Sequence, residues 1–348
     1  MDERQLRILR ELGELGSVTA VAEALLVTPS AISQQLRLLQ RSVRVPLTER
    51  DGRRLVLTDA GQALAGAAIE VETALARARH TVEEFADRPD GEVSVAAFHS
   101  AAAAFFPPLL RALAGTDGPV PRLADEDVPQ EDFPRLTRAY DIVLAHRLEH
   151  APAWPPTVTA TTLLREPLDV AMPADHPLAA KRRVTPKDVA GEPWITVHDG
   201  FPVMATIEAI SAAAGHRLHL AHRINEFAVA AEAVAAGGGL ALMPRWTMRR
   251  HPSLTLRPLS GVQARRHIDA LYRPERTARR AVRTVVAELK KAALLIQDEQ
   301  APQGRGELRD QPQRTRTRPP VRTDTTARSN PRPATKPPDA RTPPEPSD

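Results

Sequence analysis

Residues 29–41 carry the side chains of this chain that are best suited to chemistry with another molecule. Ile32, Leu36 and Leu39 recur at helical spacing and predict a buried face. The side chains on the opposite face all donate hydrogen bonds, and none is acidic: Ser30, Ser33, Gln34, Arg37 and Arg41. Serine and glutamine can bind base edges, and arginine can bind guanine or phosphate. We therefore predict a helix that lies in a groove of DNA. An ordinary buried helical hairpin is the alternative.

The residues before this helix must position it. Pro29 suits the first helical position, where its missing N–H would be unpaired anyway, and Thr28 is then the N-cap. The N-terminus of such a helix can take a phosphate group. Two helices are expected upstream. The second covers residues 20–26, capped by Ser17 or Thr19. The first has an apolar face made of Leu6, Leu9, Leu12 and Leu15.

Residues 47–57 predict a two-stranded hairpin beside these helices. Asp51 and Gly52 form a turn signal. Three arginines flank that turn: Arg50, Arg53 and Arg54. Arginines at the tip of a hairpin can enter an adjacent minor groove. A plain charged turn is the alternative.

Residues 58–90 predict one long helix with Thr58 as its N-cap. Apolar or small residues follow one another at alternating steps of four and three: Leu64, Ala68, Val71, Leu75, Ala78, Val82 and Phe85. Such a heptad seam favours pairing with a second copy of the chain. The alternative is a helix that packs on its own domain.

Residues 91–296 alternate short apolar runs with helical runs, which predicts parallel strands joined by crossover helices. The expected strands cover residues 93–98, 119–123, 141–145, 168–172, 193–196, 240–243 and 268–272. The expected helices cover residues 101–114, 133–137, 205–214, 227–236 and 276–295.

Ligands bind beyond the carboxyl ends of strands in such sheets. That rule points to four candidate ligand contacts: His99, Ser100, Thr196 and His198. Phe201 and Phe227 are candidate walls of a cleft. The alternatives are a plain N-cap for Ser100, surface or capping histidines, and core phenylalanines.

Composition excludes several classes of function. The 348 residues include no cysteine, which excludes disulfides, thiolate zinc sites and cysteine nucleophiles. The chain lacks the serine-hydrolase elbow, the zinc-protease helix and the dinucleotide-binding loop, so we expect no catalytic residues, no metal, no cofactor and no enzyme. It begins without a secretory signal pattern and has no long apolar run, so we expect a cytoplasmic protein without a membrane partner. Residues 297–348 are rich in proline and arginine and predict a disordered tail.

Four runs of sequence resemble the LysR-type transcriptional regulators: GSVTAVAEAL (16–25), VTPSAISQQL (27–36), LTER (47–50) and LTDAG (57–61). The resemblance implies an α+β multidomain chain. Residues 1–57 would form a winged helix-turn-helix domain, and residues 58–90 a linker helix for dimerisation. Residues 91–296 would form a two-lobed α/β effector domain like periplasmic binding proteins, with lobes at 91–160 plus 268–296 and at 161–267, before the disordered tail.

The resemblance also implies a function. The chain would bind a dyad-symmetric site in double-stranded DNA as a homodimer or homotetramer and sense a small-molecule effector between the lobes, with RNA polymerase as a candidate partner. Ser100 and Thr196, both already candidates, match ligand-contacting positions of the family. Pro29 stands where the family most often has glutamine, so one usual base-binding side chain is absent. An architectural DNA-binding protein without a ligand is the alternative.

Overall fold

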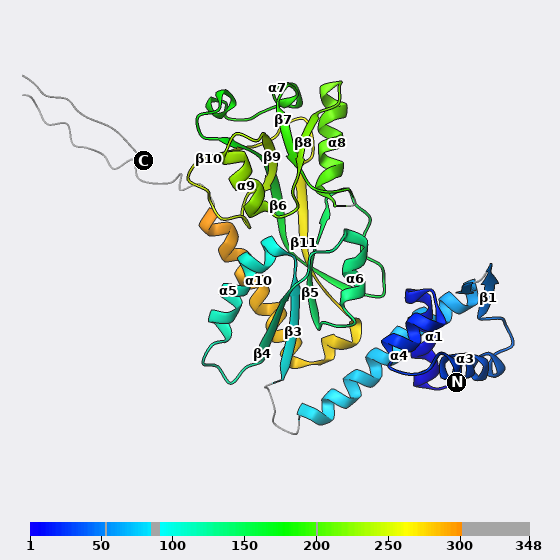
Figure 1. Cartoon of the computed structure of the whole chain (residues 1–348). Coiled ribbons are helices and arrows are strands. Elements are labelled where there is room, and N and C mark those ends of the chain that lie inside the picture. Colours follow the sequence, from blue (N-terminus) through cyan, green and yellow to red (C-terminus); the bar gives the residue numbers. More distant parts are fainter. Residues whose placement is uncertain (53, 85–90, 200, 301–348) are drawn as a thin grey trace, which may run out of the picture. The chain divides into compact units, whose positions relative to one another are not determined.

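A computed structural model describes residues 1–52, 54–84, 91–199 and 201–300. The first 57 residues, here called the head, contain the three helices and the hairpin that the sequence predicts (Figure 1). These elements are α1 (Glu3–Leu15), α2 (Val18–Ala24), α3 (Pro29–Ser42), β1 (Thr48–Asp51) and β2 (Arg54–Leu57). Leu9, Ile32 and Leu39 are buried at the centre of the head, so the predicted inner faces of α1 and α3 are confirmed.

Side-chain caps set the bounds of these helices. The Ser17 hydroxyl accepts a hydrogen bond from the Ala20 N–H at 3.0 Å, so α2 begins at Val18 rather than at Ala20 as predicted. It ends at Ala24 and not at Leu26, because Leu26 takes a φ of 54° that interrupts the helix. Thr28 caps α3 as predicted, with its hydroxyl 3.3 Å from the Ala31 nitrogen.

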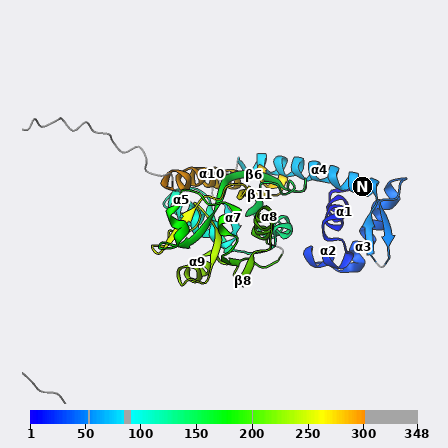
Figure 2. The ribbon, with the colours of Figure 1, turned by 90° about the horizontal axis from the view of Figure 1, so that it is seen from above.

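The long helix α4 (Asp59–Glu84) begins where the sequence predicts. The Thr58 hydroxyl accepts a hydrogen bond from the Gly61 N–H at 3.1 Å. A Cβ atom on Gly61 would lie 2.0 Å from the carbonyl oxygen of Leu47, so this close approach of two backbones requires glycine. The helix then packs against α1, and Figure 2 shows α1 crossing beneath it.

Only the first part of the predicted seam of α4 is covered by the head. Leu64 packs against the core of the head and Ala68 is fully buried. Val71 is 40% exposed and Val82 is 71% exposed, while Phe85 lies outside the described residues. The helix therefore packs on its own head and leaves part of the seam open, and pairing with a second copy stays a prediction.

The first part of the α/β region (residues 91–300) is a parallel sheet of β3 (Glu92–Ala97), β4 (Val120–Asp125) and β5 (Ile142–Leu148). The helices α5 (His99–Leu113) and α10 (Arg280–Gln300) pack side by side against it, and η1 (Gln130–Asp132) and α6 (Phe133–Leu136) adjoin β5. The last helix was expected from Arg276, but Pro274–Ala278 form the 3₁₀ helix η3 and α10 begins at Arg280.

Two antiparallel strands, β6 (Thr159–Pro173) and β11 (Arg265–Tyr272), link this sheet to a second one. The second sheet adds β7 (Pro193–Thr196), β8 (His219–Arg223), β9 (Leu240–Pro244) and β10 (Leu254–Arg257). Its helices are η2 (Pro177–Ala180), α7 (Pro186–Val189), α8 (Val203–Ala214) and α9 (Phe227–Ala235).

The crossing strands correct the prediction in two ways. The sequence pattern predicted parallel strands throughout, whereas β11 runs antiparallel to both β5 and β6. The pattern also placed only residues 168–172 in a strand, whereas β6 is 15 residues long. The reason is that residues 159–166 (TATTLLRE) have neither a continuous apolar run nor a regular alternation of polar and apolar side chains.

The C-terminal end of the described chain also differs from the prediction. Residues 297–300, expected in the tail, form the end of α10. Residues 301–348, on which the rest of that prediction falls, lie outside the described residues. None of the described helices is long and apolar enough to cross a membrane.

Candidate nucleic-acid interface and ligand cavity

The outer face of α3 presents the polar side chains that the sequence singled out. Four of the five are exposed and Ser33 is half-buried; the exposed ones are Ser30, Gln34, Arg37 and Arg41. The preceding Thr28 and Pro29 are exposed as well. The Arg37 Nε donates to the Ser33 carbonyl oxygen at 3.2 Å, so this side chain lies along its own helix. Within the described residues, this face combines hydrogen-bond donors with a helix N-terminus and carries no carboxylate.

The hairpin is tied to α3 by a residue that the sequence reasoning missed. The side chain of Gln40 donates to the Val45 carbonyl oxygen and accepts from the Leu47 N–H, both at 2.8 Å. These bonds hold the entry of β1 beside the end of α3. Arg50 and Arg54 are exposed on the hairpin, and Arg53 lies outside the described residues.

A small cavity of about 30 Å³ lies beyond the end of β3, between α5 and α9. His99, Ser100, Phe201 and Phe227 line it, as the sequence predicted for a ligand cleft. The two other predicted residues, Thr196 and His198, do not line this cavity. The Thr196 hydroxyl is buried against the Met204 sulfur at 3.7 Å. His198 is exposed, and its backbone N–H donates to Asn225 at 2.8 Å.

Arg266 is the buried cation of this cavity. Its residue is 1% exposed, and its guanidinium carbon lies 5.1 Å from the ring centre of Phe98 and 5.5 Å from that of Phe227. The Nη2 group donates to the hydroxyls of Ser100 at 2.9 Å and Thr247 at 2.7 Å. Ser100 therefore binds a side chain from a distant strand and is not a plain N-cap.

Glu166 compensates the charge of Arg266. Arg266 Nε donates to the fully buried Glu166 carboxylate at 3.0 Å, and the backbone N–H groups of Trp246 and Thr247 donate to it at 2.6 Å. The sequence reasoning missed Arg266, Glu166 and Thr247. No local signal marked the two charges, because Arg266 lies between Arg265 and His267 and Glu166 follows Arg165.

His99 joins the two sides of the cavity at its rim. Its Nδ1 lies 3.1 Å from Glu226, which precedes α9, and its Nε2 lies 3.2 Å from Asp125 at the end of β4. Asp127 also lines the cavity. Burial raises the pKa of Asp127. His99 opposes this shift, and the negative charge of the neighbouring Glu226 adds to it.

His146 closes the floor of the cavity. Its ring lies 4.4 Å from that of Phe98 and 5.3 Å from that of Phe133, and its buried Nδ1 has no hydrogen-bond partner among the described residues. Burial, and secondarily the charge of Arg266, lowers the pKa of His146 to about 3. The imidazole is therefore neutral at physiological pH.

Comparison with known proteins matches both halves of the chain. A family model described as bacterial regulatory helix-turn-helix protein, lysR family, matches residues 3–62, and one described as LysR substrate binding domain matches residues 86–294. The Hca operon transcriptional activator HcaR of Escherichia coli (strain K12) is 26% identical over 274 residues, covering 75% of this chain and 88% of the relative. The HTH-type transcriptional regulator TtuA of Agrobacterium vitis is 29% identical over 259 residues, covering 72% and 82%.

Solved structures support the fold. Full-length OxyR C199D from Pseudomonas aeruginosa superposes with a TM-score of 0.53 at 18% identity, covering 85% of this chain and 95% of that one. At this level of identity, the similarity concerns the fold alone.

The buried neutral His146 predicts a specific dependence of stability on pH. Because its folded pKa of about 3 lies below the unfolded value of 6.5, the unfolded chain binds the extra proton first as the pH falls. Between pH 6.5 and 3, His146 should therefore lower the free energy of unfolding by about 1.4 kcal/mol per pH unit. His146→Phe keeps an aromatic ring and removes this loss, which urea unfolding at pH 7, 6 and 5 measures. Exposed His150→Gln should keep the wild-type slope, and an unchanged slope in His146→Phe would contradict the assignment.

Proposed function

The chain belongs to the LysR family of bacterial helix-turn-helix regulators, and we propose that it binds double-stranded DNA through α3 and the hairpin and senses a small molecule in the cavity beside Arg266. Its curated relatives are transcriptional regulators, and the chain is a regulator and not an enzyme. Because the chain would act on transcription, we further propose RNA polymerase as a partner and the cytoplasm as its location.

The observation that carries the DNA-binding proposal is the outer face of α3. From Thr28 at its N-terminus to Arg41 near its other end, this face carries residue types that contact bases and phosphates in protein–DNA complexes. Arg50 and Arg54 of the hairpin add positive charge beside it, and we include Arg53 by its place in the sequence. The Gln40 bonds support one fixed spacing between helix and hairpin.

Ligand sensing is supported by how the cavity is assembled. Ser100 comes from α5, Phe227 from α9 and Arg266 from β11, so a molecule held there would contact elements from both sheets. Its binding would change the separation of those elements, and a ligand that binds one arrangement better shifts the population toward it. We keep Thr196 and His198 as residues near the cavity and propose no direct contact for them.

Self-association is supported by the open part of the α4 seam. Val71, Ala78 and Val82 are exposed on a helix of 26 residues, and an exposed apolar stripe of this kind favours a second helix. A homodimer formed through this seam would present two heads to a dyad-symmetric DNA site.

Loss of arginines from the proposed DNA surface should weaken binding. We expect the double variant Arg37→Ala, Arg54→Ala to bind a DNA fragment from upstream of its own gene about tenfold or more weakly than wild type. The slope of the logarithm of the binding constant against the logarithm of the salt concentration should become shallower by about two, because two phosphate or base contacts are lost. Gel shifts at several salt concentrations measure both. The control is Arg111→Ala, Arg217→Ala, which removes two exposed arginines from the α/β region. Equal affinity of the first variant and wild type would show that the surface is wrong.

Charges placed on the seam should weaken self-association. Val71→Glu, Val82→Glu puts like charges on both partners and should shift the chain from dimer toward monomer in sedimentation velocity. Ala74→Glu, Thr81→Glu adds the same charge to exposed positions off the seam and should leave the dimer intact. If both variants dissociate alike, α4 does not pair through this stripe.

A metabolite screen by thermal shift tests the cavity and the alternative of an architectural DNA binder. A ligand that contacts Ser100 should raise the melting temperature of wild type, and Ser100→Ala should lose most of that rise. Ser260→Ala removes a hydroxyl outside the cavity and should keep it. A panel of carboxylates, amino acids and amines that stabilises nothing would favour the architectural alternative.

A further inference from the structure

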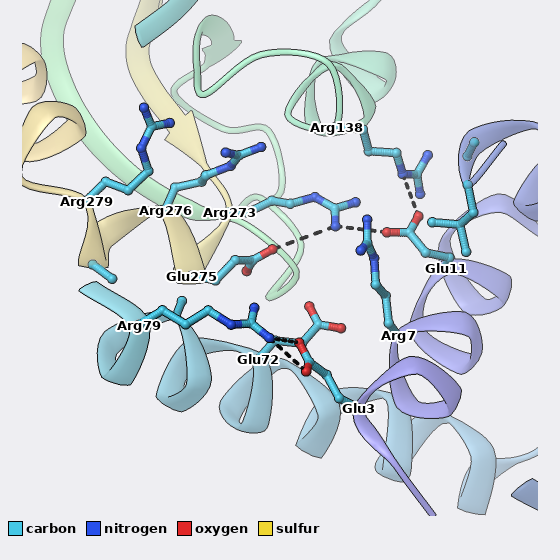
Figure 3. Close-up of a pocket in the computed structure, with 14 residues that line it drawn as sticks. Glu3, Arg7, Glu11, Glu72, Arg79, Arg138, Arg273, Glu275, Arg276 and Arg279 are labelled. Atoms are coloured by element: carbon cyan, nitrogen blue, oxygen red, sulfur yellow. Dashed lines mark hydrogen bonds and ion pairs between the residues drawn. The ribbon is translucent and has the colours of Figure 1, made fainter. Parts of the chain in front are cut away.

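We propose that a pocket between α1, α4 and η3 binds a phosphate-bearing small molecule through arginines from all three elements. The proposal is independent of the cavity beside Arg266. Figure 3 shows the side chains that line this pocket, among them Arg7 of α1, Arg79 of α4 and Arg276 of η3.

Size favours this pocket as a ligand site. Its volume is about 460 Å³, whereas the cavity beside Arg266 holds about 30 Å³. Pockets that take small metabolites measure about 300–1,000 Å³. The larger pocket thus has room for a nucleotide-sized molecule as it stands, whereas the cavity beside Arg266 must widen to take its ligand.

The charge of the lining favours an anion. Six arginines and four glutamates line the pocket. Three of the glutamates are already paired with lining arginines: Glu11 with Arg273 at 2.9 Å, Glu3 with Arg79 at 3.0 Å, and Glu275 with Arg273 at 3.8 Å. Glu72 and Glu275 form the floor, where both contact the buried Arg10. An anion would therefore lie on the arginine side of the pocket, away from Glu72.

Several arginines have donors to spare. Arg7 is exposed and forms no hydrogen bond or ion pair within the described part of the chain. Arg276 and Arg279 share one carboxylate, Asp141, at 2.9 and 2.7 Å. That carboxylate also accepts from the backbone and hydroxyl of Ser94. The Arg79 pair with Glu3 is 66% exposed on the arginine side, so water screens it and it is easily exchanged.

Phosphate suits this arrangement better than a single carboxylate does. A guanidinium donates two parallel hydrogen bonds to phosphate oxygens, and a pyrophosphate group offers enough oxygens for several arginines at once. The bound group would replace the weak surface pair of Arg79 and give Arg7 a partner that it lacks among the described residues.

Binding here would affect the head directly. The anion would hold α1 and α4 to η3 at the start of α10, and its affinity would depend on whether these elements are together. The pocket is therefore suited to a second signal, separate from the ligand in the cavity beside Arg266.

The test uses the full chain and inorganic pyrophosphate as the probe. Isothermal titration calorimetry measures the dissociation constant of pyrophosphate. Sodium chloride is added to keep the ionic strength the same in every titration. Arg7→Gln, Arg79→Gln removes the free donor and the exchangeable one, and should weaken pyrophosphate binding about tenfold or more, because each lost bond is charge-assisted. The matched control Arg4→Gln, Arg77→Gln removes exposed arginines from the same two helices outside the pocket, and should bind within about twofold of wild type.

Thermal unfolding without pyrophosphate checks that both variants are folded. If Arg7→Gln, Arg79→Gln proves unstable, Arg7→Gln alone is titrated, since Arg7 has no partner to lose among the residues that the structure describes. Absence of pyrophosphate binding to wild type, or an equal loss in variant and control, overturns the proposal. Neither result bears on DNA binding by α3, which the gel shifts measure separately.

Discussion

The arrangement of the described residues depends on one buried cation, Arg10 of α1. Its side chain is 1% exposed and its guanidinium meets Glu14 of its own helix, Glu72 of α4 and Glu275 of η3. Burial acts to lower its pKa, but these carboxylates outweigh burial and raise it, so the charge persists. A buried charge that loses a partner costs about 3–5 kcal/mol, whereas the intact group contributes little net stability. Arg10 therefore selects one docking arrangement of α1, α4 and η3 more than it strengthens the fold.

The same device recurs inside the α/β region. Arg266 of β11 is buried against Glu166 of β6, and the two strands link the sheets at that point. In both places a buried arginine and a buried carboxylate come from distant segments, and each compensates the charge of the other only when the two segments are packed together. Buried ion pairs thus fix how the head packs on η3 and how the two sheets are joined. The apolar cores supply the bulk of the stability.

The sequence predicted those features that depend on near neighbours. The bounds of α3 follow from Thr28, Pro29 and a helical apolar repeat, and Ser100 follows from its place after a strand. Arg10 and Arg266 were missed because each finds its partners far along the chain. Arg266 and Glu166 are 100 positions apart, and Arg10 and Glu275 are 265 apart. On a single sequence, such residues cannot be distinguished from ordinary surface charges.

The length of α4 has a mechanical consequence. A helix of 26 residues is about 39 Å long, and it is fixed near its middle where Glu72 meets Arg10. If the helix tilts by about 10° about that point, each end moves by about 3.4 Å, which is about one base-pair step along DNA. Because the two arms of this lever are about equal, a shift of about 3 Å at the far end of α4 would reach the DNA-binding end almost undiminished, and it would change the spacing between two heads by about one base pair.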